Sequence, residues 1–340
     1  MNRPLHSNRH AEQLLSDTAA HAVRLPPRIA VLIPCFNEEA AIAKVIADFR
    51  QALPTADVFV YDNNSTDDTR AVALAAGAIV RSEALQGKGN VVRRMFADIE
   101  ADAYVLVDGD GTYDASSAPR MVEMLLLQSL DMVNGARVAT TTNAYRPGHA
   151  IGNRVLTSTV AIVFGDRIRD MLSGYRALSR RFVKSFPALA TGFETETELT
   201  VHALELRLPI AEVDTPYRDR PAGSQSKLRT FRDGFRILRT IALLVKEERP
   251  LLFFSAVGSL LAVTSLILAL PLLSDYLATG LVPRFPTAIL VTGLMILGFT
   301  SFVTGLVLDA VTLSRRELKR LHYLALQGPN LVERRRTPTP

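Results

Sequence analysis

The chain of 340 residues has no tryptophan and only one cysteine, Cys35. One cysteine excludes an intramolecular disulfide framework and a zinc site built from cysteines. The absence of tryptophan excludes every motif that contains this residue, which decides one alternative below. Charged residues make up only 21%, whereas hydrophobic residues reach 48%, enough to bury a core, so a disordered chain is excluded. The mean hydropathy of +0.16 indicates that apolar residues are concentrated in part of the chain.

Charge is absent from two long segments near the C-terminus, residues 251–273 and 285–308. As helices, each would be roughly 35 Å long, against a hydrocarbon core of about 30 Å. Buried helices of a soluble domain, the alternative, seldom run so long without a charge. We therefore predict a two-helix transmembrane hairpin over residues 250–313.

Basic residues flank both segments: Arg229, Arg232, Arg236, Arg239, Lys246 and Arg249 before the first, and Arg315, Arg316, Lys319 and Arg320 after the second. The positive-inside rule then places both termini in the cytoplasm and the protein in a plasma or inner membrane. The net charge is +5, but the basic residues form no stripe with interleaved aromatics. We therefore expect a membrane partner and no nucleic acid.

Residues 228–249 have apolar side chains at helical spacing, with arginines largely on the opposite face. We expect an amphipathic juxtamembrane helix on the cytoplasmic leaflet, and an ordinary surface helix is the alternative. Residues 1–27 are expected to form a disordered tail, and residues 314–340 a basic cytoplasmic tail. Residues 28–227 remain as one cytoplasmic domain.

Short apolar strands alternate with helices in the first part of this domain. We expect strands at 28–34, 57–62, 78–81 and 103–107, and helices at 38–51, 67–76 and 90–100. This alternation predicts an α/β fold with a doubly wound, mostly parallel sheet.

Polar residues follow three of these strands, at Asn37-Glu38, Asp62-Asn63-Asn64 and Asp108-Gly109-Asp110. Because ligands of doubly wound sheets bind beyond the carboxyl ends of the strands, these clusters predict a site. Asp108 and Asp110 can approach one cation, and their hard oxygen ligands suit Mg²⁺ or Mn²⁺. An EF-hand is excluded because Pro119 occupies the twelfth position, whereas an acidic surface turn remains the alternative.

The turn at residues 86–90, Gln-Gly-Lys-Gly-Asn, gives a weaker signal. It is neither a Walker A loop nor a GxGxxG motif. A phosphate contact through Lys88 and a plain glycine turn before a helix both stay open.

Further motifs are IPCFNEE at 33–39, DNNSTD at 62–67, GAR at 135–137, NR at 153–154, Asp170 with SGYR at 173–176, FETE at 193–196, YRDR at 217–220 and GSQSK at 223–227. Together the motifs resemble those of the family-two inverting glycosyltransferases, which have the A-type nucleotide-sugar-binding fold. Within this family, the chain is similar to the polyprenyl-phosphate hexosyltransferases, the group of dolichyl-phosphate mannose synthase and bactoprenol glucosyltransferase. The similarity covers about residues 28–248, and the predicted hairpin fits the membrane-anchored branch.

The resemblance implies roles for individual residues. The nucleotide-sugar donor would be bound by Pro34, Asn37, Glu38, Asp62, Asn63, Lys88 and Asp108. The acceptor would be bound by Arg137, Arg154, Ser173, Arg176 and Glu194. The catalytic residues would be Asp110, Arg137, Arg220 and Lys227. Many dolichyl-type members have a glutamine where this chain has Thr112, which leaves Asp108 and Asp110 as the expected metal ligands.

Simpler structural roles remain open for several of these residues. Glu194 and Glu196 are also favourable acids in the first turn of a helix, and Ser173 fits a tight turn before a strand. Ion pairing or membrane-facing charge would account for Arg137, Arg176, Arg220 and Lys227.

The resemblance further implies that a hexose is transferred from a nucleotide-diphospho-sugar to a polyprenyl phosphate with inversion. UDP-glucose is the first expected donor, followed by GDP-mannose or a UDP-N-acetyl sugar. A bound Mg²⁺ or Mn²⁺, with Arg220 and Lys227 on a closing loop, would neutralise the leaving diphosphate. A phosphate acceptor is mostly dianionic near pH 7, because its second pKa is about 6. It therefore needs arginines such as Arg137 and Arg154 to place it and no general base.

Three other functions were considered. A processive polysaccharide synthase of the same superfamily needs a QxxRW motif, which a chain without tryptophan cannot have. A membrane glycosyltransferase with a hydroxyl acceptor and a catalytically inactive membrane scaffold both stay open. Association through the two spans into a homo-oligomer is compatible with each of them.

Overall fold

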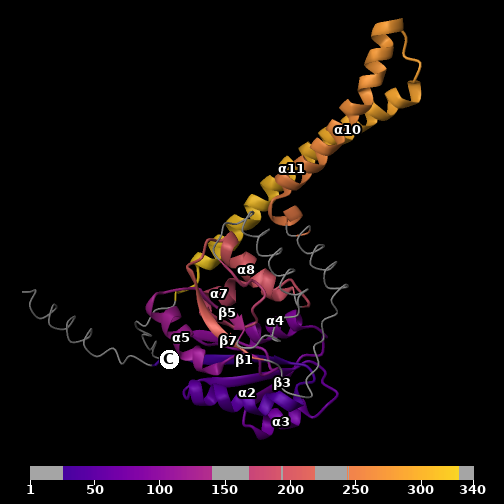
Figure 1. Ribbon diagram of the computed structural model, residues 1–340. Helices are drawn as coiled ribbons and strands as arrows, with labels where there is room; N and C mark the ends of the chain where they lie inside the picture. The colour runs from indigo at the N-terminus through magenta and orange to yellow at the C-terminus, as the bar shows by residue number, and fades with distance from the viewer. Residues whose placement is uncertain (1–25, 140–167, 193, 219–242, 244, 329–340) are drawn as a thin grey trace, which may run out of the picture.

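The computed structural model describes residues 26–139, 168–192, 194–218, 243 and 245–328. Within this part of the chain, seven strands form one sheet in the order β3-β2-β1-β4-β6-β5-β7 (Figure 1). The strands are β1 (Ile29–Cys35), β2 (Asp57–Asp62), β3 (Ile79–Ser82), β4 (Ala103–Leu106), β5 (Met132–Ala139), β6 (Arg176–Ser179) and β7 (Ile210–Tyr217). β6 runs antiparallel to both of its neighbours, and the other pairs are parallel. The predicted doubly wound, mostly parallel sheet is confirmed.

Helices cover both faces of the sheet. One face carries α2 (Glu39–Ala52), α3 (Thr69–Ala75) and α5 (Ala118–Leu127), with the short 3-10 helix η1 (Ala115–Ser117) before α5. The other face carries α4 (Lys88–Asp98), α7 (Arg180–Ser185) and α8 (Thr195–Glu205). In Figure 1, α2 and α3 lie below the sheet, and α4, α7 and α8 lie above it.

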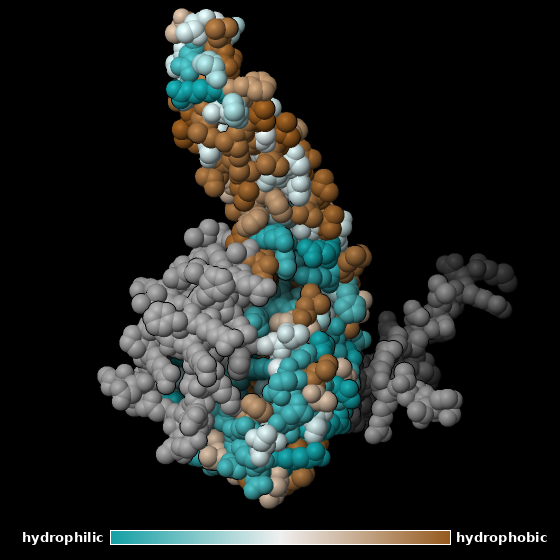
Figure 2. Space-filling model, turned by 90° about the vertical axis from the view of Figure 1, so that its right-hand side faces the viewer, coloured by the Kyte–Doolittle hydropathy of each residue, from teal (hydrophilic) through white to brown (hydrophobic). Residues whose placement is uncertain are grey.

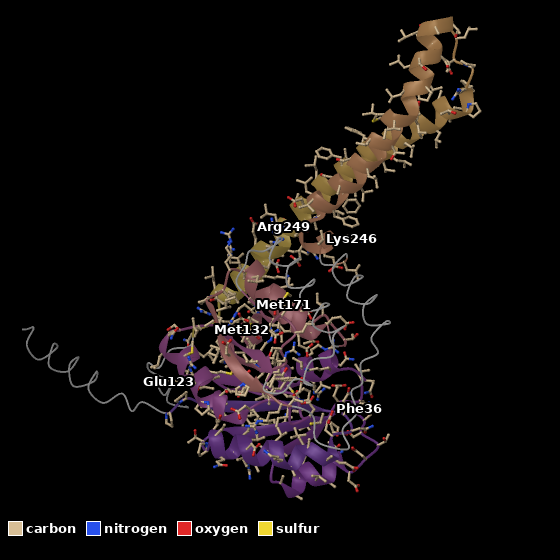
Figure 3. The ribbon with its side chains drawn as sticks, viewed as in Figure 1. Phe36, Glu123, Met132, Met171, Lys246 and Arg249 are labelled. Carbon is tan, nitrogen blue, oxygen red and sulfur yellow. The ribbon has the colours of Figure 1, made fainter. Side chains whose placement is uncertain are left out.

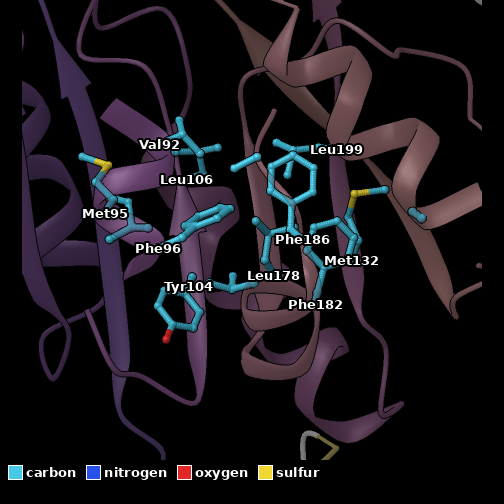
Figure 4. Close-up of a cluster of buried hydrophobic side chains, with 14 of the residues drawn as sticks. Val92, Met95, Phe96, Tyr104, Leu106, Met132, Leu178, Phe182, Phe186 and Leu199 are labelled. Carbon is cyan, nitrogen blue, oxygen red and sulfur yellow. The ribbon is translucent and has the colours of Figure 1, made fainter. Parts of the chain in front are cut away.

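The continuous apolar sequence of β1 follows from its position between two cores. Successive strand residues point to opposite faces, so Leu32 packs in one core and Val31 and Ile33 pack in the other. The core beneath α4, α7 and α8 is rich in aromatic side chains, including Phe96, Tyr104 and Phe182 (Figure 4). Phe96 and Tyr104 meet edge to face, with their ring centroids 6.4 Å apart. A strand buried on both faces holds its carboxyl end, where the polar clusters begin, in a fixed position.

Two long helices, α10 (Pro250–Thr279) and α11 (Phe285–Leu324), form a hairpin that projects from the domain (Figure 1). Both are long and apolar enough to cross a membrane, and only 11% of the most apolar window of each is buried. Figure 2 shows the hairpin as a mainly hydrophobic rod above a mainly hydrophilic domain. Such exposure disfavours the alternative that these are core helices of a soluble domain.

Hydrogen bonds from hydroxyl groups link the two helices of the hairpin. Ser265 Oγ donates to the carbonyl of Val291 at 2.8 Å, and Ser301 Oγ donates to the carbonyl of Phe254 at 2.9 Å. The 40 residues of α11 make a helix about 60 Å long, roughly twice the thickness of a hydrocarbon core. Its C-terminal turns contact α7 of the domain.

Several predicted segments fall outside the described residues: 1–25, 140–167, 219–242 and 329–340. Of the predicted juxtamembrane helix, residues 243 and 245–249 are described, and all of these except residue 249 are helical. Lys246 and Arg249 lie at the base of the hairpin, on the side of the domain (Figure 3).

Candidate active site

The Asp-Gly-Asp turn follows β4 at the carboxyl edge of the sheet. Thr112 donates to Asp110 Oδ1 twice, from its backbone nitrogen at 3.1 Å and from its hydroxyl at 2.6 Å. Asp110 is buried, whereas the Asp108 side chain is 29% exposed. The turn therefore holds one carboxylate fixed and presents the other to a ligand.

Gly174 packs directly against Asp108. A Cβ atom at this position would lie 2.9 Å from Asp108 Cγ, so only a glycine fits without a shift. The backbone nitrogen of Gly174 donates to the Tyr113 hydroxyl at 2.8 Å. The SGYR motif thus places its backbone against the Asp-Gly-Asp turn.

Lys88 lies between two carboxylates. Its ammonium group contacts both Asp108 and Glu196, and its side chain is only 10% exposed. Burial alone would lower the pKa of Lys88, but the charges of Asp108 and Glu196 outweigh burial and raise it above its ordinary value. Lys88 therefore carries a positive charge beside the turn.

The glycine turn at 86–90 brings Lys88 to this position. The Gly89 nitrogen donates to the carbonyl of Thr191 at 3.2 Å. A Cβ atom on Gly89 would lie 2.7 Å from the carbonyl carbon of Ala190. The glycine thus lets the start of α4 pack against the segment that leads into α8, which carries Glu196.

The loops after β1 and β2 are joined by hydrogen bonds. Asn37 Oδ1 accepts from the Thr66 nitrogen at 2.8 Å, and the Asn37 nitrogen donates to Ser65 Oγ at 2.9 Å. Asp62 accepts from the Ser65 nitrogen at 3.3 Å. Glu38 is buried, and its nitrogen donates to Thr69 Oγ1 at 2.8 Å. The predicted donor residues of these two loops therefore form one continuous structure, which begins beside Pro34 in β1.

Asn63 is used within the protein. Its amide nitrogen donates to the carbonyls of Glu83 and Leu85, both at 2.8 Å, and its Oδ1 accepts from the Gly87 nitrogen at 2.7 Å. The side chain thus ties the β2 loop to the turn that carries Lys88. This geometry favours a positioning role for Asn63 over direct donor contact.

Arg137 forms a bidentate pair with Asp170. Its Nε and Nη2 atoms lie 2.7 and 2.8 Å from the two carboxylate oxygens, and its backbone nitrogen donates to Oδ2 at 3.1 Å. The guanidinium also lies over the ring of Tyr217, 5.5 Å from its centroid. The alternative that Arg137 pairs with an acid is therefore what the structure has, although the acid is buried.

Ser173 and Arg176 are fully buried. Ser173 Oγ donates to the carbonyl of Gly135 at 2.5 Å. Arg176 donates to the carbonyls of Ser173, Met171 and Glu196 at 3.1, 2.7 and 2.9 Å, and burial lowers its pKa to about 10. Both side chains support the rim of the site, which is the carboxyl edge of the sheet with the Asp-Gly-Asp turn. This favours a structural role over contact with an acceptor.

Sequence reasoning missed an aromatic cluster next to the turn. Tyr113 lies 5.4 Å from both Tyr175 and Tyr217, measured between ring centroids. Burial raises the pKa of Tyr217, and the charges of Asp110 and Asp108 add to this, while Arg137 opposes them. Tyr217 thus lies within electrostatic reach of Arg137 and of the Asp-Gly-Asp turn, the diacid turn formed by Asp108 and Asp110. The DGTYD sequence contains Tyr113, but nothing local indicates its partners.

Arg218 closes the other side of the turn. Its Nη2 lies 3.0 Å from Asp114 Oδ1, and its backbone nitrogen donates to the carbonyl of Thr112 at 2.9 Å. A narrow pocket beside the turn is lined by Phe49, Val107, Asp108, Gly111, Tyr113, Asp114 and Arg218, among others. The chain therefore leaves β7 directly at the site.

The remaining predicted residues are placed unequally. Glu194 precedes α8 and is partly buried, close to Gly192. Three predicted residues lie outside the described part of the chain: Arg154, Arg220 and Lys227.

The donor set at the turn fits a divalent cation that shares its coordination. Among the described residues, no group of three or more His, Cys, Asp or Glu side chains is arranged to hold a metal. Two carboxylates one residue apart are nevertheless what Mg²⁺ or Mn²⁺ uses where waters and substrate phosphates complete the shell. Asp108 and Asp110 would hold such an ion.

Comparisons with known proteins identify the family of the chain. A model of glycosyl transferase family 2 matches residues 30–186. The glycosyltransferase AglJ of Haloferax volcanii is 34% identical over 306 residues, which cover 88% of this chain and 99% of that protein. A dolichyl-phosphate hexose transferase of the same organism is 28% identical over 222 residues, which cover 65% of this chain and 95% of that protein.

A solved structure shares the fold. Glucosyl-3-phosphoglycerate synthase of Mycobacterium tuberculosis, crystallised with Mn²⁺, UDP and glucosyl-3-phosphoglycerate, superimposes with a TM-score of 0.53 at 26% identity. The match covers 72% of this chain and 85% of that one. These matches confirm the family and the fold that the motifs predict.

Proposed function

The chain belongs to glycosyl transferase family 2, and from this premise we propose that it transfers a hexose from a nucleotide-diphospho-sugar to a polyprenyl phosphate. The observation that carries the proposal is that Tyr217 contacts two parts of the rim: its ring centroid lies 5.5 Å from the guanidinium of Arg137 and 5.4 Å from the ring centroid of Tyr113, which follows the Asp-Gly-Asp turn. The turn with Lys88 suits a diphosphate with its cation, and Arg137 suits a second phosphate. The relative named dolichyl-phosphate hexose transferase supports this acceptor.

A divalent cation, when bound by Asp108 and Asp110, would neutralise charge that develops on the leaving diphosphate. Lys88 adds a second positive charge beside the same turn. We propose that Arg220 and Lys227, which follow Arg218 in sequence, add further positive charge to neutralise the diphosphate. UDP-glucose is the first expected donor, followed by GDP-mannose or a UDP-N-acetyl sugar.

The acceptor phosphate needs placement more than activation. It is mostly dianionic near pH 7, so we propose no general base. Arg137 is held against Asp170 through two parallel bonds, which fixes the guanidinium in one orientation. With Arg154, it would direct the phosphate oxygen at the anomeric carbon for a single inverting displacement.

The hairpin would hold the site at the membrane surface. A polyprenyl phosphate keeps its chain in the bilayer and its head group at the surface. We propose that α10 and α11 span the membrane, with the domain and both termini in the cytoplasm, in agreement with the basic flanks. A nucleotide sugar and a lipid phosphate can then meet at the rim.

The test uses the purified full chain in nanodiscs with radiolabelled UDP-glucose, GDP-mannose or UDP-N-acetylglucosamine. Undecaprenyl phosphate is the acceptor in one arm and diacylglycerol in the other. We expect label in a polyprenyl-phosphate product that requires Mg²⁺ or Mn²⁺. Label in diacylglycerol alone would favour the hydroxyl-acceptor alternative, and no transfer with any donor would favour the inactive scaffold.

A further inference from the structure

Lys88 pairs with Asp108, the more exposed of the two expected cation ligands in the Asp-Gly-Asp turn. Its ammonium group contacts the carboxylates of Asp108 and Glu196, and the Glu196 side chain is only 8% exposed. The second oxygen of that carboxylate, Glu196 Oε2, is buried and has no hydrogen-bond partner among the described residues. The lysine thus neutralises Asp108, while Glu196 anchors the lysine from the protein side.

This arrangement sets the ammonium group against a divalent cation. A cation that approaches Asp108 alone meets a positive charge that already pairs with the same carboxylate, so the two compete. A diphosphate changes the balance, because it offers negative oxygens to both the cation and the lysine. The lysine side chain has a flexible four-carbon stem, so its ammonium group can turn while Glu196 keeps it near the rim.

We propose that Lys88 couples the binding of the cation to the binding of a nucleoside diphosphate. Lys88 holds Asp108 while the diphosphate is absent, and it turns to the diphosphate when the nucleotide arrives, which releases Asp108 to the cation. Cation and nucleotide then bind strongly only together. The inference rests on the proposed function, because it takes Asp108 and Asp110 as the cation ligands.

The coupling is measured as binding, without turnover. Free Mn²⁺ is followed by electron paramagnetic resonance in a titration of the purified full chain in detergent, with and without saturating UDP. We expect UDP to raise the Mn²⁺ affinity of the unmodified chain by a factor on the order of ten or more. By reciprocity, Mn²⁺ must raise the UDP affinity by the same factor, which an independent UDP titration checks.

Lys88→Met removes the competing charge. Its Mn²⁺ affinity without UDP should rise about threefold or more, and the factor by which UDP raises that affinity should fall. Arg94→Met is the matched control, because Arg94 is an exposed basic residue on the same helix, and it should leave both quantities unchanged.

Glu196→Gln tests the same coupling should Lys88→Met fail to fold. With Glu196 neutral, Asp108 is the remaining carboxylate that pairs with the ammonium group in the described part of the chain, so Mn²⁺ affinity without UDP should fall and the UDP effect should grow. An unchanged coupling factor in the folded variants would overturn the inference. No Mn²⁺ binding to the unmodified chain, with or without UDP, would instead contradict the cation site of the proposed function.

Discussion

Helix α8 has a cluster of buried charges near each end, and the two clusters differ in how they are closed. Near its start, Glu196 and Asp108 share one cation, Lys88, and Asp108 stays 29% exposed. At its end, Glu205 pairs with Lys319 at 2.7 Å and Arg316 at 3.4 Å, both from α11, and is only 2% exposed. The cluster at the rim thus carries one more negative than positive charge. In the second cluster, called the strut because it joins α8 to α11, the buried Glu205 has two basic partners.

A second acid strengthens the strut. Asp131 is fully buried and accepts from Arg181 Nη2 at 2.8 Å, from Ser179 Oγ at 2.7 Å and from the Tyr323 hydroxyl at 2.6 Å. Tyr323 belongs to the last turn of α11, so the hairpin is joined to the domain through these bonds. The comparison indicates which acidic residues are candidates for binding a ligand: those that are partly exposed and outnumber their basic partners.

The largest effect is expected at the rim. Asp110→Asn keeps an oxygen that can accept both bonds from Thr112, so the turn should fold, but the negative charge for the cation is lost. Sugar transfer should fall by a factor on the order of 10³. The rate of lipid-product formation and the thermal unfolding midpoint are measured together. Glu123→Gln, an exposed acid on α5, is the control. Unchanged transfer in a folded Asp110→Asn protein would remove the metal argument.

The strut should show the opposite pattern. Asp131→Asn breaks a buried ion pair and leaves the charge of Arg181 without its carboxylate, which should destabilise the protein by about 3 kcal/mol. The thermal midpoint in detergent should fall by several degrees, while transfer per folded molecule is kept. Asp57→Asn, at an exposed pair with Arg28, should change stability by less than about 0.5 kcal/mol. Equal thermal midpoints for the two variants would contradict the stabilising role of the Asp131 ion pair.

The sequence predicts the rim better than the strut, because the rim depends on strand ends. β1, β2 and β4 are apolar runs, and a parallel sheet brings the residues that follow them together. Arg316 and Lys319 were interpreted as the basic flank of a span, and their pairing with Glu205 joins positions more than 100 residues apart. A charge pattern fixes the number of basic residues but not their partners.

The same limit explains Lys88 and Arg176. The turn at 86–90 is a weak motif, and its meaning comes from contact with the backbone at 190–191. The alternative interpretation of Ser173, a tight turn before a strand, agrees with β6, which begins at Arg176, but it does not indicate that this arginine is buried. Arg176 is buried there because two carbonyls of the preceding loop and the carbonyl of Glu196 in α8 accept its hydrogen bonds. Long-range contacts of this kind leave no periodic pattern in the sequence.

A smaller loss of stability should follow from a fall in pH, through a histidine near the C-terminal end of α8. His202 lies among Phe182 and Phe186, and burial lowers its pKa to about 3, with a further contribution from the charge of Lys319. The unfolded state, with a pKa near 6.5, therefore binds more protons between pH 6.5 and pH 3, so stability falls as the pH drops through that window. Between pH 6.5 and pH 5, the loss is about 2 kcal/mol.

The thermal midpoint of the unmodified chain is measured from pH 7 to pH 5 beside that of His202→Gln. The variant lacks the titrating group, so its midpoint should depend less on pH, whatever its absolute stability. Parallel curves for the two proteins would show that His202 does not carry this acid sensitivity.

The smallest effect should come from Tyr323→Phe, which removes one bond of the strut and keeps the rest. Asp131 retains Arg181 and Ser179, and a phenylalanine ring can still lie under the Arg181 guanidinium, which is 4.3 Å from the Tyr323 centroid. The loss should be about 1.5 kcal/mol, the contribution of a hydrogen bond to a charged group. Tyr276→Phe, at the exposed far end of α10, should leave the midpoint unchanged. If Tyr323→Phe altered the Michaelis constant for the donor and left the midpoint unchanged, the strut would belong to the rim's chemistry, and the distinction between the two ends of α8 would fail.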